Sequence, residues 1–147
     1  MRLIGGSERL ILSRRSPAPK PAATVVLRFT PAAEHVRTAR LVAVAVARRA
    51  GLDESRLDEV RLAVGEICAR AVRRCRDASV TASVLVEMDD RGPYLDVLVT
   101  DRSGVVGGGD ESVGLALVRG LADYVEVRPG PGGPGGTVHL RWTVHQG

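Results

Sequence analysis

The chain is poor in aromatic residues and lacks long apolar runs, which excludes a core built mainly of aromatic side chains and a membrane-spanning helix. Aromatic residues make up only 3% of the 147 residues, so the core must consist mainly of Val, Leu and Ala. No apolar run approaches the roughly 18 residues that a membrane-spanning helix needs. The apolar stretch at 10–12 is too short for a signal peptide. We therefore expect a cytoplasmic protein without a membrane partner.

Cysteine and histidine are also scarce, and their positions offer neither a disulfide nor a metal site. Cys68 and Cys75 fall on one expected helix, where seven residues separate their Cα atoms by about 10 Å. A disulfide needs less than about 7 Å. His35, His139 and His145 are scattered along the chain. We expect both cysteines to be buried apolar side chains in a reducing compartment, and we expect no metal ligand set.

The net charge of +4 arises in residues 1–23. This segment contains five of the 21 Lys and Arg residues and one of the 17 Asp and Glu residues, so residues 24–147 are neutral overall. Prolines at positions 17, 19 and 21, and the lack of a sustained hydrophobic period, predict a flexible basic tail. Because the tail lacks interleaved aromatic residues and the remainder is neutral, no nucleic-acid partner is expected.

Hydrophobic periodicity predicts alternating strands and helices from residue 24 onwards. The expected elements are a strand at 24–29, helices at 32–50 and from about 53 to 76, hairpin strands at 79–88 and 94–100, a helix at 112–122, and strands at 124–128 and 137–144. The Pro- and Gly-rich stretch at 129–136 is expected to be a loop, and glycines 107–109 are interpreted as a flexible lid. The fold class is α+β, a two-layer sandwich with about three helices on one face of a mostly antiparallel sheet of about five strands.

The helix at 53–76 carries the most informative pattern. Asp53 or Ser55 is placed to cap its N-terminus. Glu66 and Arg70 stack one turn apart on the flank of its buried face, where a carboxylate can face a cleft. The same spacing also fits an ordinary surface ion pair that adds a few tenths of a kcal/mol. The apolar residues that recur on the buried face are Val60, Val64, Ile67, Ala71 and Cys75.

Four segments carry a resemblance to a known family. They are Leu62–Val72, the strand end Val99–Ser103, the stretch Gly114–Val118 followed by Leu121-Ala122-Asp123, and Gly136-Thr137-Val138. In order and spacing they are similar to the ATPase domain shared by histidine kinases, DNA gyrase and heat-shock chaperones (GHKL). Residues 24–147 are identified as such a domain. Within that family they resemble most closely the bacterial anti-sigma-factor serine kinases.

The resemblance implies a site for ATP. It assigns Asp101 to the exocyclic amine of adenine and Glu66 to the role of general base on an attacking hydroxyl. A carboxylate at a strand end can accept from that amine, and a glycine-containing loop that leads into a helix offers backbone N–H groups to phosphate. The further residues assigned to nucleotide binding by the resemblance are Arg70, Ser103, Gly104, Gly114, Leu115 and Thr137.

Arg70 departs from the family pattern, which has a magnesium-binding asparagine at this position. A guanidinium has only donors and cannot ligate a metal, so the usual Mg²⁺ bridge is expected to be absent. Two interpretations stay open. Arg70 binds phosphate directly, or it pairs with Glu66 and fills the pocket. Ser103 and Val105 also stand where the wider superfamily prefers glycine.

The resemblance implies an ATP-binding transcription regulator of the anti-sigma-factor type. Its partner would be a sigma factor or an anti-anti-sigma protein. If active, it would be a serine/threonine protein kinase that phosphorylates a serine of the anti-anti-sigma partner. The alternative is a degenerate, nucleotide-free member that acts only as a protein-interaction module. The family also implies a homodimer formed through the sheet edge near the first strand.

Overall fold

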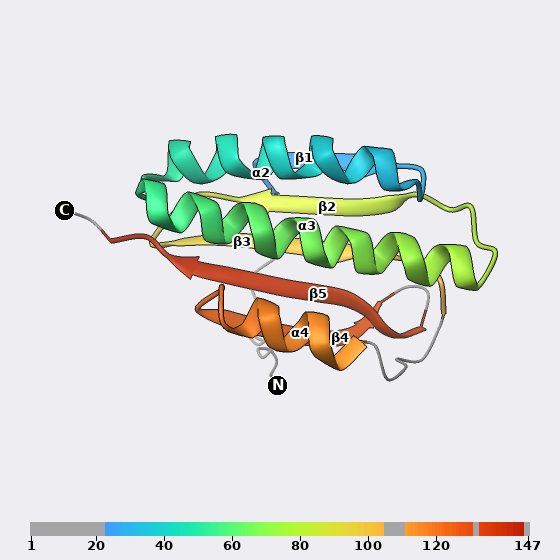
Figure 1. Cartoon of the computed structure of the whole chain (residues 1–147). Helices are drawn as coiled ribbons and strands as arrows, with labels where there is room; N and C mark the ends of the chain where they lie inside the picture. The colour runs from blue at the N-terminus through green and yellow to red at the C-terminus, as the bar shows by residue number, and fades with distance from the viewer. Residues whose placement is uncertain (1–22, 105–110, 131–132, 146–147) are drawn as a thin grey trace, which may run out of the picture.

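A computed structural model of the chain describes residues 23–104, 111–130 and 133–145. It is a two-layer α+β sandwich in which the helices cover one face of a five-stranded antiparallel sheet (Figure 1), and this confirms the expected fold class. The elements are β1 (Val25–Phe29), the 3-10 helix η2 (Ala33–His35), α2 (Val36–Ala50), α3 (Glu54–Asp77), β2 (Val84–Asp89), β3 (Tyr94–Thr100), α4 (Glu111–Arg119), β4 (Tyr124–Gly130) and β5 (Gly133–Thr143). The expected tail lies outside the described residues, apart from Ala23.

The strand order is β1-β2-β3-β5-β4, and every neighbouring pair is antiparallel. The chain leaves β3, passes through α4, forms β4 at the edge of the sheet and returns as β5 between β3 and β4. The end of β3 therefore lies beside β5, where Thr100 pairs with Thr137. One residue further, the N–H of Asp101 donates to the carbonyl of Gly136 at 2.8 Å. This hydrogen bond ties Asp101, at the end of β3, to the neighbouring strand β5.

The helix α3 runs between α2 and α4 across the sheet (Figure 1). Its N-terminus is capped as expected, because the side chain of Asp53 accepts a hydrogen bond from the N–H of Arg56 at 3.1 Å. Val60 and Val64 are completely buried, so the predicted apolar face is the face that packs on the sheet. Gly65 lies beneath Arg40 of α2, where a Cβ would come within 2.6 Å of the Arg40 Cδ. The two helices consequently pack closely.

Three expected boundaries differ from the structure. The strand β2 begins at Val84 rather than at 79, because the N–H of Val80 bonds to the carbonyl of Cys75 and Ser79 takes a positive φ of 56° to end α3. The helix α4 ends at Arg119, before the expected residue 122. The loop expected over 129–136 was wrong for most of its length, since β4 reaches Gly130 and β5 starts at Gly133. Glycines 107–109 lie outside the described residues.

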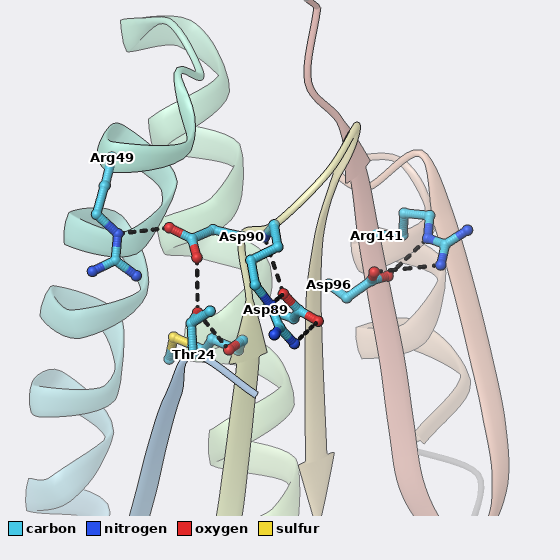
Figure 2. Close-up of polar contacts among 8 residues, drawn as sticks. Thr24, Arg49, Asp89, Asp90, Asp96 and Arg141 are labelled. Carbon is cyan, nitrogen blue, oxygen red and sulfur yellow. Dashed lines mark hydrogen bonds and ion pairs between the residues drawn. The ribbon is translucent and has the colours of Figure 1, made fainter. Parts of the chain in front are cut away.

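Polar contacts join the two layers at the end of the sheet opposite to Asp101 (Figure 2). The Nε of Arg49, on α2, lies 2.6 Å from the Oδ2 of Asp90 in the turn between β2 and β3. The hydroxyl of Thr24 donates to the Oδ1 of Asp90 at 2.8 Å and lies 3.1 Å from the carbonyl oxygen of Met88. Helix α2 is thereby connected to the β1–β2 edge, away from the candidate site.

Candidate functional site

The candidate site lies where the end of β3 and the first turns of α4 meet α3. Glu66, Arg70 and Arg74 follow at intervals of four residues, so they form one stripe along α3. At 1.5 Å per residue, Glu66 and Arg74 are about 12 Å apart along the helix. The stripe therefore extends over about two turns of α3, from Glu66 to Arg74.

Asp101 is at the Arg74 end of the stripe and is buried. Its Oδ1 accepts hydrogen bonds from the N–H of Ser103 at 3.0 Å and from the hydroxyl of Ser103 at 2.7 Å. Its Oδ2 accepts from the Nε of Arg74 at 3.0 Å. A carboxylate has about four acceptor positions. Three donors within the protein therefore already hold the group that the resemblance assigns to adenine.

Arg74 is a site residue that sequence reasoning missed. Its guanidinium is buried, and its ion pair with Asp101 offsets the cost of removing both charges from water. The available signal was the four-residue repeat itself, because Arg74 continues the stripe of Glu66 and Arg70 by one helical turn. That repeat places Arg74 on the same face of α3 as Glu66 and Arg70. It gives no indication of the partner, which lies 27 residues further along the chain.

Glu66 is at the other end of the stripe, beside α4. A Cβ on Gly114 would lie 3.1 Å from the Oε2 of Glu66, so the glycine lets the backbone of α4 approach this carboxylate closely. Among the described residues, Glu66 forms its ion pair with Arg73, at 3.8 Å, whereas the sequence spacing had suggested Arg70. Glu66 is about one-third exposed. The structure thus brings Glu66 and Gly114 together and adds Arg73 as a neighbouring cation.

The remaining candidate residues divide between the site and the core. Arg70 is buried in the middle of the stripe, between Glu66 and Arg74. Thr137 is buried where β5 begins to pair with β3, with its Oγ1 3.3 Å from the Oγ1 of Thr100. Gly104 adopts a left-handed backbone with φ of 71°, which a glycine accepts without strain. Leu115 packs against the hydrophobic core.

The position that binds magnesium in the family carries no oxygen ligand in this chain. Magnesium prefers oxygen ligands, chiefly carboxylates, phosphates and water. Within residues 23–104, 111–130 and 133–145, no three His, Cys, Asp or Glu side chains come together as a metal site. The position that holds a metal-binding asparagine in the family is the guanidinium of Arg70. A guanidinium has only donors and cannot take over the asparagine's contact with the metal.

A second polar cluster lies on the sheet face that the helices leave uncovered. It lines a hollow of about 460 Å³. The Oδ1 of Asp96 lies 2.6 Å from the Nε2 of His139 and 2.7 Å from the Nε of Arg141 (Figure 2 shows the arginine contact). Burial raises the pKa of Asp96, but the hydrogen bonds from His139 and Arg141 outweigh it and leave this pKa below its usual value. The carboxylate of Asp96 thus joins His139 and Arg141 on β5 to β3, so the cluster stabilises the sheet.

The comparison with known families agrees with the geometry. The model of the histidine kinase-like ATPase domain matches residues 29–142, a range that includes Glu66, Asp101 and Gly114. No curated protein sequence matches the chain. No helix in the described part of the chain is long and apolar enough to cross a membrane. Because the family model covers most of the chain, nucleotide binding is the property that the family implies, and the chain belongs to the histidine kinase-like ATPase domain family.

Proposed function

We propose that the chain is a nucleotide-binding regulator of the anti-sigma-factor type that binds a triphosphate without magnesium. The observation that carries the proposal is the stripe on α3, with Glu66 facing α4 at one end and Arg74 facing Asp101 at the other. The resemblance implies the same order for Glu66, at the phosphates, and Asp101, at the base. The departure at Arg70 affects the phosphates, because it replaces a metal-binding group with a cation.

The phosphates have suitable partners beside α4. Arg73 is more than half exposed and forms an ion pair with Glu66. Arg70 lies on the same helix, between these two residues. A guanidinium binds phosphate oxygens in pairs and keeps its charge at any physiological pH. The first turn of α4 adds backbone N–H groups and the positive end of the helix dipole. These groups together neutralise phosphate charge that a metal ion would otherwise neutralise.

Isothermal titration of ATP and ADP, with Mg²⁺ and with chelator, tests the proposal. We expect micromolar affinity that survives chelation. Arg73→Met should weaken binding about tenfold or more, because a hydrogen bond to a charged group contributes about 1.5–3 kcal/mol. Arg48→Met is the matched control, since Arg48 is an exposed arginine on α2. Affinity that requires Mg²⁺ would contradict the metal-free site, and Arg70→Asn is expected to create that requirement.

For the kinase reaction, we propose Glu66 as the base. Its carboxylate would take the proton of the partner's serine hydroxyl while the serine oxygen bonds to the γ-phosphorus and ADP leaves with the electrons of the broken P–O bond. The partial exposure of Glu66 beside α4 supports this role, because a protein substrate can reach it. Glu66→Gln should abolish phosphorylation of a serine-bearing anti-anti-sigma protein and leave ATP affinity within about threefold. Equal phosphorylation of the partner by wild type and by Glu66→Gln would exclude Glu66 as the base.

The second candidate function is a protein-interaction module that no longer binds nucleotide. The specific observation in its favour is the buried Arg74–Asp101 pair, which occupies the carboxylate that the family uses for the base. The same titration separates the two functions. No heat with ATP or ADP under either condition, together with retained binding to a sigma factor or an anti-anti-sigma protein, would establish the module.

We also propose that the protein is a homodimer that uses the β1 edge. β1 is an edge strand, and Val26 on it is half exposed. Beside it lies a hollow of about 350 Å³ lined by Val25, Leu41, Val42, Ala45, Val46 and Arg49. Leu41→Glu should shift the chain toward monomer in sedimentation velocity. Leu62→Glu is the control, because Leu62 is similarly exposed on α3. A monomer at every concentration of wild type would contradict the dimer.

A further inference from the structure

We infer that Arg74 prevents Asp101 from selecting adenine, so that the site binds a nucleotide through its phosphates with little preference for the base. The inference rests on the proposed nucleotide-binding function. It concerns base selectivity, and it departs from the adenine contact that the resemblance assigns to Asp101. Arg74 acts here through Asp101, as a residue that positions and occupies the carboxylate.

The hydrogen bonds of the Asp101 carboxylate limit what a base could contact. To read the exocyclic amine of adenine, Asp101 must present an oxygen with an acceptor position directed at the base. Ser103 directs two donors at the Oδ1, and the Nε of Arg74 donates to the Oδ2 at 3.0 Å. Two donors thus fill the Oδ1, and the one acceptor position that is left lies on the Oδ2, which Arg74 already holds. The side chain of Asp101 is almost entirely buried, which leaves little surface for a ligand.

The ion pair between Arg74 and Asp101 resists opening. Arg74 and Asp101 are both buried, so withdrawal of the guanidinium would leave a buried carboxylate without its cation. Leaving one member of a buried ion pair alone is strongly unfavourable. An amine is neutral and cannot replace the charge of the guanidinium. Adenine therefore competes poorly for the Oδ2 of Asp101.

The pairing of Asp101 with Arg74 affects how the site distinguishes one base from another. A site that hydrogen-bonds a substrate amine strongly rejects an analogue without that amine, because its buried acceptor is then left unpaired. Inosine triphosphate is such an analogue, since it carries an oxygen where adenine carries the amine. With Asp101 held by Arg74, the acceptor is paired whichever base is present. The two nucleotides should then bind nearly equally.

The experiment compares ATP, inosine triphosphate and inorganic tripolyphosphate by titration into the full chain, with chelator present. For wild type we expect the two nucleotide affinities to agree within threefold and tripolyphosphate to compete with both. Arg74→Met frees the Oδ2 of Asp101 and should raise the preference for ATP to at least tenfold. Arg74→Lys keeps a cation and should retain most of the wild-type ratio. Arg61→Met, an exposed arginine on the same helix, should leave the ratio unchanged.

A tenfold or larger preference of wild type for ATP over inosine triphosphate would overturn the inference and leave the proposed function intact. An unchanged ratio in a folded Arg74→Met variant would overturn it as well. Failure of wild type to bind any of the three ligands would overturn the inference together with the proposed function. If Arg74→Met does not fold, as circular dichroism would show, the wild-type ratio and Arg74→Lys still decide the question.

Discussion

The Nε of Arg74 lies 3.0 Å from the Oδ2 of Asp101, and the two side chains are 6% and 1% exposed. This contact connects α3, the middle helix of the helical layer, to the end of β3, where the N–H of Asp101 bonds to the carbonyl of Gly136. A buried pair of this kind contributes little compared with apolar packing, but it is costly to break on one side only. It therefore affects both the stability of the protein and the chemistry of the site.

The first prediction concerns the stability of this pair. Arg74→Met should lower the free energy of unfolding by about 3–5 kcal/mol, because it leaves Asp101 buried without its cation. The double variant Arg74→Met/Asp101→Asn should lose less than the sum of the two single variants, since neither charge remains. Urea unfolding of the four proteins measures the coupling. Additive losses would show that the contact contributes no coupling energy, and Arg61→Met should change stability by no more than about 0.5 kcal/mol.

Gly114→Ala should change the affinity for ATP without lowering the thermal stability of the protein. Alanine in place of a helical glycine favours the helix by up to about 1 kcal/mol. The new Cβ, however, would lie 3.1 Å from the Oε2 of Glu66, so this carboxylate must move away from α4. We expect a melting temperature equal to or above that of wild type and a several-fold change in ATP affinity. Gly120→Ala is the control, because its Cβ would meet only the Leu117 carbonyl at 3.4 Å. Unchanged affinity in Gly114→Ala would show that Glu66 and α4 need not approach closely.

The acid sensitivity of the sheet should depend on Asp96. Hydrogen bonds from His139 and Arg141 hold its folded-state pKa below the unfolded value of about 3.9, in spite of burial, which raises it. The stabilisation is therefore complete above about pH 4 and is lost as the pH falls through the folded-state pKa. Arg141→Met should be less stable than wild type at pH 6, and the difference should shrink by pH 3. A difference that stays constant with pH, in urea titrations, would contradict this assignment.

Neither cysteine should react with a thiol reagent while the protein is folded. Both side chains are completely buried and free of disulfide bonds. Burial raises the pKa of the Cys68 thiol to about 12, against the opposing effect of Arg40. The pKa of Cys75 is also raised, by burial and by the charge of Asp101. Because the thiolate is the reactive form, Ellman's reagent at pH 8 should detect two thiols only in denaturant. Rapid labelling of the native protein would indicate that α3 opens locally.

Local patterns were sufficient for most of the helical layer. The apolar period of α3 predicted its buried face, and Asp53 caps the helix as its side chain suggested. Gly51, with φ of 101°, ends α2 because a left-handed residue is needed there. These features depend on residues within one or two helical turns of each other. A single sequence therefore contains all the information that they require.

The β4–β5 hairpin shows where local patterns fail. Its turn region is rich in Pro and Gly, which usually indicate a loop. In the structure Gly130 pairs with Gly133, and a Cβ on Gly130 would lie 2.7 Å from the Oγ1 of Thr137. The absence of a side chain is what allows these strands to continue. Pairing between backbones leaves no period in the sequence, so the extension of both strands was not foreseen.

By itself, the sequence determined the layers, the family and the face of α3 that carries Glu66, Arg70 and Arg74, because periodicity specifies which side of a helix is buried. Only the tertiary structure decided the partners on that face. It placed Arg74 against Asp101 and Arg73 against Glu66. Such choices depend on how α3, α4 and the end of β3 pack together. A difference of one turn or one rotamer changes the partner of a charge without changing the hydrophobic pattern.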